Sequence, residues 1–262
     1  MIVVDAWRGP FRDHLVFFAD GDAVLELARA CRPHELFRIR HALAVTRVER
    51  ARHVGVGYTS CIDLRPDPDA IYHGMDAKSC RYEVRRAAKL GDRLVLRRND
   101  VRSIDDFRPL FNDLIARTRY TRPLTARRYE QYRRFSDVFV AYVDDSPVAG
   151  HLVVRDPEAG RTRLVFSVSA RFVEGPLRAI SAPVNRWLHW QEMLAYREEG
   201  YSIYDFGGVN PDSPIGRFKL SFGGGVEQGT NLVLAGALAG PALGLAETAL
   251  ERRRRGRGGR SV

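Results

Sequence analysis

The sequence has few cysteines, and none is spaced as in a disulfide framework or a metal site. The 262 residues contain three, Cys31, Cys61 and Cys80, which are too far apart for a CxxC pair. Seven histidines show neither HxxxH nor HExxH spacing. No GxSxG elbow marks a hydrolase nucleophile. We therefore expect buried or unused thiols, no metal and no hydrolase triad.

Long apolar runs are scarce as well. The longest, residues 232–246, contains Pro241 and three glycines and ends before Glu247, so it falls short of the roughly 20 residues that a membrane span needs. We expect a terminal strand followed by a helix there, with a peripheral membrane contact as the alternative. The first twenty residues mix charges and a proline among apolar positions. They are unlike a signal peptide, so we expect a cytoplasmic protein.

Acidic residues are absent from the C-terminal stretch, residues 252–262, which holds six arginines. The formal net charge of the chain is +10, so the rest of the chain is only mildly basic. We expect this stretch to be a disordered basic tail that adds nonspecific attraction to RNA or to anionic lipid.

Apolar periodicity predicts alternating helices and strands in the first half of the chain. Helical spacing covers 23–32, 68–91 and 103–120, and strand-like alternation covers 37–50, 55–64 and 93–99. Gly91 provides a stop signal for the second helix. Ser103 is the expected N-cap of the third helix, which places Phe107, Leu110, Phe111 and Leu114 on one core-facing side.

The sequence pattern in the second half of the chain predicts a three-stranded meander. Residues 137–170 contain three apolar runs separated by the turn signals DDSP and DPEAG. A helix over 178–200, a strand over 201–206, a glycine-rich loop and a last strand complete the order. We expect Lys219 and Phe218 to lie in that loop.

Two motifs carry a family resemblance. The stretch YDFGGVNPDSPIGRFKLSFGGG, residues 204–225, combines DFGG, FK and FGG, and CRYEVRRAAKLG, residues 80–91, is an arginine-rich helix that ends at glycine. Together with the element order, they resemble the Fem family of aminoacyltransferases within the GNAT superfamily. The resemblance covers roughly residues 60–235 and implies an α/β (α+β) GNAT-like acyltransferase fold, a mixed sheet flanked by helices.

The resemblance also implies a division of the chain. We expect a reduced N-terminal α/β subdomain over 1–60 and a GNAT-like acyltransferase domain over 61–235. A C-terminal helix over 236–251 and the basic tail over 252–262 would follow. The oligomeric state is left open.

The resemblance assigns roles to the loop residues. Lys219 would contact the acyl donor and stabilise the oxyanion of acyl transfer, and Phe218 would orient the donor. Asp205 would serve as general base or, equally, would cap the N–H groups of Gly207 and Gly208. Four glycines would allow tight turns or close backbone approach: Gly207, Gly208, Gly223 and Gly224.

The donor and the acceptor stay open between alternatives. The resemblance implies aminoacyl-tRNA as donor and an amine of a cell-wall-like or small-molecule acceptor. Coenzyme A-dependent N-acetyltransferases share the fold, but RFVEGPLRA, residues 171–179, does not match their Q/RxxGxG/A pyrophosphate loop. A noncatalytic RNA-binding or membrane-associated module is the alternative from another class.

Two arginine clusters fit a phosphate-bearing partner. Arg81, Arg85 and Lys89 follow i, i+4 spacing beside Arg86, which gives a positive helix stripe or simply a solvated face. Residues 117–134 hold seven arginines interleaved with tyrosines, suited to phosphate contact and base stacking. The alternative for this second cluster is an amphipathic helix with buried tyrosines.

Overall fold

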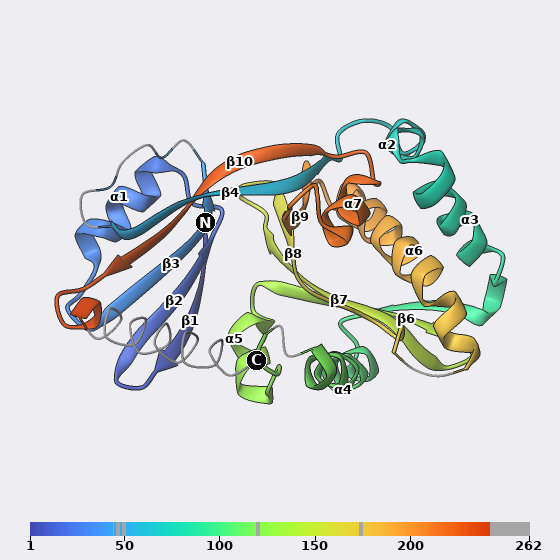
Figure 1. The fold of residues 1–262 in the computed structure, drawn as a ribbon, viewed down its shortest axis with the longest axis horizontal. Helices are drawn as coiled ribbons and strands as arrows, with labels where there is room; N and C mark the ends of the chain where they lie inside the picture. Colours follow the sequence, from blue (N-terminus) through green and yellow to red (C-terminus); the bar gives the residue numbers. More distant parts are fainter. Residues whose placement is uncertain (44, 46–47, 49–50, 119–120, 173–174, 242–262) are drawn as a thin grey trace, which may run out of the picture. The chain divides into compact units, whose positions relative to one another are not determined.

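The computed structural model describes residues 1–43, 45, 48, 51–118, 121–172 and 175–241. The chain forms two compact units (Figure 1). Unit 1 comprises Met1–Gly57 and the chain from Gln228 onward, and unit 2 comprises Tyr58–Glu227. The basic tail expected over 252–262 and most of the helix expected over 236–251 lie outside the described residues. The domain boundaries expected at 60 and 235 stay a prediction.

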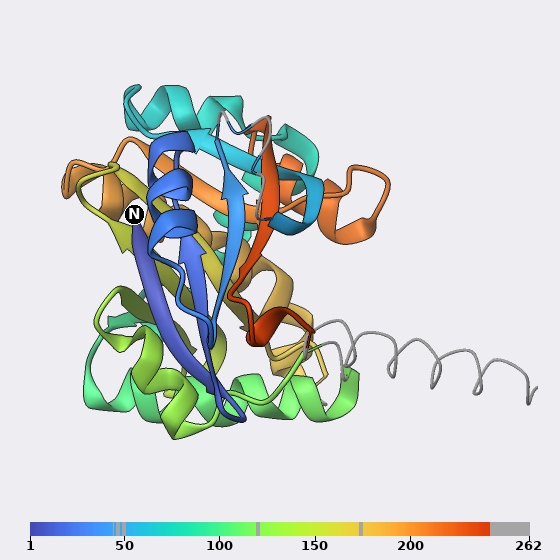
Figure 2. The same ribbon diagram turned by 90° about the vertical axis from the view of Figure 1, so that its left-hand side faces the viewer.

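Unit 1 is a sheet on which helix α1 (Gly21–Ala30) packs. Its strands are β1 (Ile2–Arg8), β2 (Phe11–Phe17), β3 (Glu35–Ala42) and β10 (Gly225–Ala235). They lie side by side in the order β1-β2-β3-β10. Strands β2 and β3 run parallel, connected through α1, which Asp20 caps by accepting from the N–H of Ala23 at 2.9 Å. Figure 2 shows α1 lying along one face of these strands. Its core includes Val16, Val24, Phe37, Ile39, Leu232 and Leu234.

Unit 2 has a larger sheet with the order β4-β9-β8-β7-β6-β5. The strands are β4 (Ala51–Asp63, which begins in unit 1), β5 (Leu94–Arg98), β6 (Ser136–Val143), β7 (Ser146–Asp156), β8 (Arg161–Ser169) and β9 (Ile203–Gly208). Strands β6, β7 and β8 form the expected antiparallel meander. Strand β9 runs parallel to β8 and antiparallel to β4, so the sheet is mixed.

Helices cover both faces of the unit 2 sheet (Figure 1). Helices α3 (Tyr82–Ala88) and α6 (Pro176–Glu198) pack together on one face, and α4 (Val101–Thr118) and α5 (Ala126–Arg133) lie on the other. Two short helices, α2 (Pro68–Gly74) and α7 (Pro214–Leu220), complete the unit. Both faces of β6 and β7 are therefore buried, which explains their nearly unbroken apolar sequence. No described helix combines the length and apolar character that crossing a membrane requires.

Three local predictions were wrong. The helix expected over 68–91 is broken, because Met75 is extended and Asp76 starts a π-helical turn over Ala77–Arg81 by accepting from the N–H of Ser79. Ser103 is not an N-cap: Asp100 accepts from its N–H at 2.7 Å, so α4 begins at Val101, three residues earlier than a helix capped by Ser103 would. The glycine-rich loop contains helix α7.

Candidate active site

Strands β8 and β9 are hydrogen-bonded to each other over only a short length. The parallel ladder joins three residue pairs and ends at Arg163 and Asp205. Beyond it, β8 continues to Ser169 in register with β7, and β9 continues to Gly208 in register with β4. Backbone N–H and C=O groups that leave a ladder must find other partners. The end of β9 is therefore a place where a ligand can bind between the two strands.

Helix α7 holds Lys219 at this end of β9. Ser213 caps the helix by accepting from the N–H of Gly216 at 2.9 Å, and Pro214 occupies the first turn. The ammonium of Lys219 donates to the carbonyl oxygen of Gly208 at 2.7 Å. Burial lowers the pKa of Lys219 to about 8. At neutral pH the amine of Lys219 is therefore still mainly protonated. This ammonium is poorly solvated and is held at the end of β9.

Asp205 is a buried, fully engaged carboxylate. One oxygen accepts from Arg163 at 2.6 Å, and the other accepts from the N–H of Gly207 at 2.7 Å and from the hydroxyl of Thr59. Its side chain is 1% exposed. This arrangement matches the capping alternative for Gly207, and Asp205 has no visible route to an acceptor amine. A general base role for Asp205 stays a prediction that the geometry disfavours.

Phe218 packs inward from α7. Its ring lies 5.5 Å from that of Phe222 and 5.8 Å from that of His189, and the guanidinium of Arg186 stacks over it at 4.6 Å. Phe218 and Lys219 are consecutive residues with separate tasks: the ring anchors α7 to α6, and the ammonium reaches Gly208. Arg186 was not anticipated from the sequence.

A buried polar network lies directly beneath Phe218. His151 on β7 contacts Glu192 Oε1 through Nδ1 at 2.6 Å and Asn185 Oδ1 through Nε2 at 3.0 Å. Tyr204 on β9 donates to Glu192 Oε2 at 2.5 Å, and its oxygen lies 3.0 Å from His189 Nδ1. His151, His189 and Glu192 have fully buried side chains.

Within this network the carboxylate of Glu192 is charged and the imidazole of His189 is neutral. Burial opposes ionisation of Glu192, but the neighbouring imidazoles of His151 and His189 outweigh it and hold the pKa at about 2. Burial lowers the pKa of His189 to about 3. Because Tyr204 donates to Glu192, its oxygen can accept from His189 Nδ1–H, so the lone pair is at Nε2. Within the described residues, His189 Nε2 has no hydrogen-bond partner.

Comparison with known proteins identifies the family. A family model described as "Acetyltransferase (GNAT) domain" matches residues 78–219, more than half of the chain. The chain belongs to this GNAT family. Its α/β fold and mixed sheet are those of a GNAT domain, and it is an acyltransferase. A search of curated protein sequences found no match.

Solved structures resemble most of this GNAT chain in fold. FemX matches with a TM-score of 0.62 at 13% identity, covering 88% of this chain and 83% of FemX. The C-terminal domain of a protein assigned as a lysylphosphatidylglycerol synthetase from Agrobacterium fabrum matches with a TM-score of 0.54 at 16% identity, covering 92% and 83%. L-PGS from Bacillus licheniformis matches with a TM-score of 0.52 at 13% identity, covering 95% and 85%. The resemblance to Fem-type aminoacyltransferases in the GNAT superfamily is confirmed at the level of fold.

Of the four glycines expected to shape the site, Gly207 has a left-handed backbone conformation, and Gly223 and Gly224 lie in close packing. Gly207 has a φ of +74°, and Gly223 has a φ of +83° with space for a Cβ blocked by the carbonyl oxygen of Gly74 at 2.3 Å. A Cβ on Gly224 would lie 2.6 Å from the carbonyl oxygen of Cys61. At Gly208 the nearest atom would be 4.0 Å away, so its contribution is the carbonyl that Lys219 contacts.

The first arginine cluster lies on the π-helical turn and α3. Arg86 donates to the carbonyl of Ala179 in the first turns of α6 at 3.4 Å. Arg85 is exposed, and Arg81 is half-buried. Arg86 therefore lies beside the N-terminal part of α6.

The second cluster is an amphipathic helix. Tyr129 and Tyr132 on α5 are buried, with 6% and 5% of their surface exposed. They are therefore not available for base stacking. Tyr120 lies outside the described residues. The alternative of buried tyrosines is the correct one for α5.

Three residues of the buried network are of the types that bind metal ions. Ligand atoms of His151, His189 and Glu192 lie within 4.8 Å of one another. Both carboxylate oxygens of Glu192 already accept hydrogen bonds, from His151 and from Tyr204, and the two imidazole rings are stacked 3.9 Å apart. Stacked rings do not aim their nitrogens at one point, so the arrangement fits a hydrogen-bonded network.

Proposed function

We propose that this GNAT acyltransferase transfers an aminoacyl group from aminoacyl-tRNA to an amine of a cell-wall-like or small-molecule acceptor. The observation that carries the proposal is the hydrogen bond from Lys219 Nζ to the carbonyl of Gly208 at 2.7 Å, next to the end of the β8–β9 ladder. Lys219 stands in the FK dipeptide on which the resemblance to the Fem family rests.

The chemistry follows from that position. A neutral amine attacks the carbonyl carbon of the acyl donor, and the carbonyl oxygen becomes an oxyanion. The ammonium of Lys219 exchanges its bond to Gly208 for a bond to this oxyanion, which it stabilises as the negative charge develops. Collapse of the intermediate breaks the bond to the donor's leaving oxygen or sulfur, and the proton that the attacking nitrogen loses is taken up by this leaving atom. Phe218 and the buried network hold α7 so that Lys219 meets the oxyanion.

Asp205 supports this step indirectly. Its carboxylate ties Arg163 on β8 to the N–H of Gly207 on β9, so it fixes the strand ends between which the acyl group would bind. We assign Asp205, Gly207, Gly223 and Gly224 to shaping the site and Gly208 to positioning Lys219. Arg81, Arg85 and Arg86 are assigned to phosphate contacts of the donor.

The N-terminus of α6 favours an aminoacyl donor over a coenzyme A thioester. Pro176 opens the helix and has no N–H, and the N–H of Arg178 donates to the carbonyl of Gly175 at 3.2 Å. Two of the backbone donors that could bind a pyrophosphate at a helix N-terminus are therefore missing or already used. An acetyl-CoA-dependent N-acetyltransferase is the second candidate, supported by the description of the family model.

Two experiments test this assignment. Calorimetry with acetyl-CoA and with a mixed pool of charged tRNA compares the two donors, and we expect saturable binding of charged tRNA. Mass spectrometry of candidate amine acceptors incubated with the same pool should show the mass of an added amino acid. Acetyl-CoA binding with acetylated product, and no aminoacylated product, would make the chain an N-acetyltransferase.

A further inference from the structure

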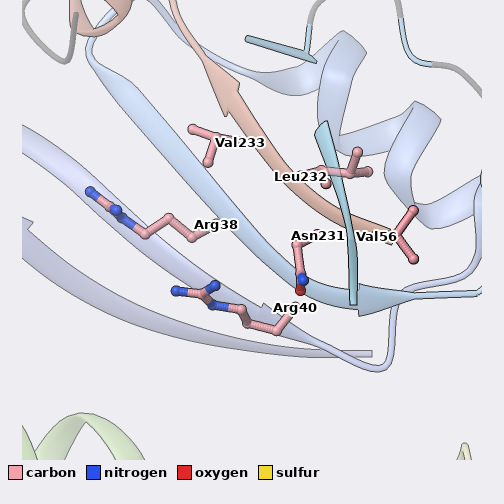
Figure 3. Close-up of a pocket in the computed structure, with 7 residues that line it drawn as sticks. Arg38, Arg40, Val56, Asn231, Leu232 and Val233 are labelled. Carbon is pink, nitrogen blue, oxygen red and sulfur yellow. The ribbon is translucent and has the colours of Figure 1, made fainter. Parts of the chain in front are cut away.

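Unit 1 contains a pocket that the proposed acyl transfer does not use. It has a volume of about 190 Å³ and lies on strands β3, β4 and β10. Six residues that line it are labelled in Figure 3: Arg38, Arg40, Val56, Asn231, Leu232 and Val233. The figure shows Arg38 and Arg40 extending from β3 with their guanidinium groups pointing the same way.

The polar groups of the pocket are hydrogen-bond donors. Arg38 donates through Nε to Asp13 at 2.6 Å, and its Nη2 is buried with no hydrogen-bond partner in the described part of the chain. Asn231 accepts the N–H of His41 through Oδ1 at 3.1 Å, which leaves its NH₂ as the group that can still bond. A buried guanidinium nitrogen without a hydrogen-bond partner carries a free-energy cost. An anion in the pocket would remove that cost.

The backbone is shaped to place Asn231 there. The register of β10 against β3 shifts between Thr230 and Leu232, so a β-bulge lies at Asn231, and bulges redirect a side chain. On β4, a Cβ at Gly57 would lie 2.4 Å from Asn231 Nδ2. Any larger residue at position 57 would displace the amide. The bulge and the glycine together give Asn231 its position beside the arginines.

The composition of the pocket defines the chemical class of its ligand. Guanidinium groups bind phosphate through paired N–H donors, and two arginines suit a dianion better than a single carboxylate. Val56 lines the pocket as well, and Val233, the strand partner of Arg38, adds an apolar side chain that can contact the carbon part of an ester. The volume suits a phosphate group and the carbon atoms attached to it.

We propose that the pocket of unit 1 binds the phosphate group of a phosphate monoester, held by Arg38, Arg40 and Asn231. Such a group occurs in soluble nucleotides and in glycerol phosphates related to lipid headgroups. The chemistry of the pocket is shared by both sources, so the experiment must separate them. This inference is independent of the acyl-transfer proposal, because binding needs no donor or acceptor.

The test is calorimetry of the full chain with adenosine 5′-monophosphate and with glycerol 3-phosphate. We expect saturable binding of at least one of them, weakened about 10- to 100-fold by Arg38→Gln, the loss of charged hydrogen bonds worth about 1.5–3 kcal/mol. Arg40→Gln should weaken it similarly. The stronger ligand identifies the source of the phosphate. Arg29→Gln, on the exposed surface of α1, removes the same charge away from the pocket and should leave binding unchanged.

Gly57→Ala provides a second test that leaves every charge in place. It should weaken binding because the new methyl displaces Asn231, and thermal unfolding would verify that each variant is folded. Three outcomes would overturn the proposal: no saturable binding of either ester, equal binding by wild type and Arg38→Gln, or an equal loss in Arg29→Gln. Acetate binding as strongly as the phosphate esters would also overturn it, since the site would then select any anion.

Discussion

Tyr204 and Asp205 are adjacent on β9, and their side chains enter two different buried networks. The hydroxyl of Tyr204 donates to Glu192 at 2.5 Å, and the carboxylate of Asp205 accepts from Arg163 at 2.6 Å. Successive residues of a strand point to opposite faces, so β9 is fixed from both sides immediately before Gly208. The carbonyl that positions Lys219 thus stands on a rigid strand end.

Replacing Asp205 tests whether it is a base or a structural anion. Asp205→Asn should lower the free energy of unfolding by about 1–3 kcal/mol, because Arg163 loses its charged partner in a buried place. Urea unfolding measures the change. Asp63→Asn, which removes an exposed partner of Arg65, should cost less than about 1 kcal/mol. A stable Asp205→Asn variant that binds its donor and has lost the chemical step would favour the general base role.

The buried His189 should make the protein sensitive to mild acid. Its folded pKa is lowered to about 3 from the ordinary value of 6.5, so below pH 6.5 the unfolded chain takes up a proton that the folded protein excludes. Stability is present above pH 6.5 and falls as the pH drops, by up to about 1.4 kcal/mol per pH unit from this group. Glu192, with a folded pKa of about 2, adds to the loss only below about pH 4.5.

Urea unfolding between pH 4.5 and 6.5 separates these contributions. His189→Phe should show a shallower pH dependence than the wild type in this window, whatever its absolute stability. His73→Gln, which removes an exposed histidine, is the matched control and should keep the wild-type slope. The same slope in wild type and His189→Phe would contradict a neutral, buried His189.

Helix α7 should depend on Gly216. A Cβ there would lie 1.7 Å from the carbonyl oxygen of Asn210, so Gly216→Ala must displace the turn that starts the helix. We expect the rate of the chemical step to fall at least about 10-fold, since small misplacements of a catalytic group are costly. At Gly225 a Cβ would meet no atom within 4 Å, and Gly225→Ala should retain activity. Equal activity of the two variants, measured in single-turnover reactions, would show that the position of α7 does not matter.

The pH dependence of the chemical step should report Lys219. With a pKa of about 8, Lys219 is charged below pH 8 and neutral above it, so its stabilisation of the oxyanion is lost as the pH rises through 8. Single-turnover rates should therefore decline on the alkaline side. In Lys219→Arg the remaining activity should show no such decline, since a guanidinium stays charged. An alkaline decline at the same pH in the arginine variant would assign it to another group.

The sequence predicted the elements whose signals are local. The meander followed from DDSP and DPEAG between apolar runs, and α6 from its length and periodicity. Helix α7 was missed because Pro214 and Gly216 read as turn residues, although Ser213 is a normal N-cap. Asp100 rather than Ser103 caps α4 for a similar reason: both residue types are good caps, and only the backbone geometry selects one.

The site was predictable only as far as the family motif extends. Lys219 and Phe218 were identified from the FK dipeptide, and the choice of Asp205 as a cap or a base depended on Arg163, 42 residues away. His151 and Glu192 are 41 residues apart, and their pairing arises from the packing of α6 on β7. A glutamate three residues after a histidine in α6 was the available signal.

The central claim is that the ammonium of Lys219 stabilises the oxyanion, and Lys219→Met tests it most directly. Single-turnover rates with bound aminoacyl donor and the identified amine acceptor should fall about 100- to 1000-fold, the usual cost of losing one such donor, with donor affinity and the unfolding transition nearly unchanged. Lys219→Arg should restore part of the rate. A methionine variant that transfers the acyl group at nearly the wild-type rate would contradict the account. Lys219 would then have only a structural role, through its hydrogen bond to the carbonyl of Gly208.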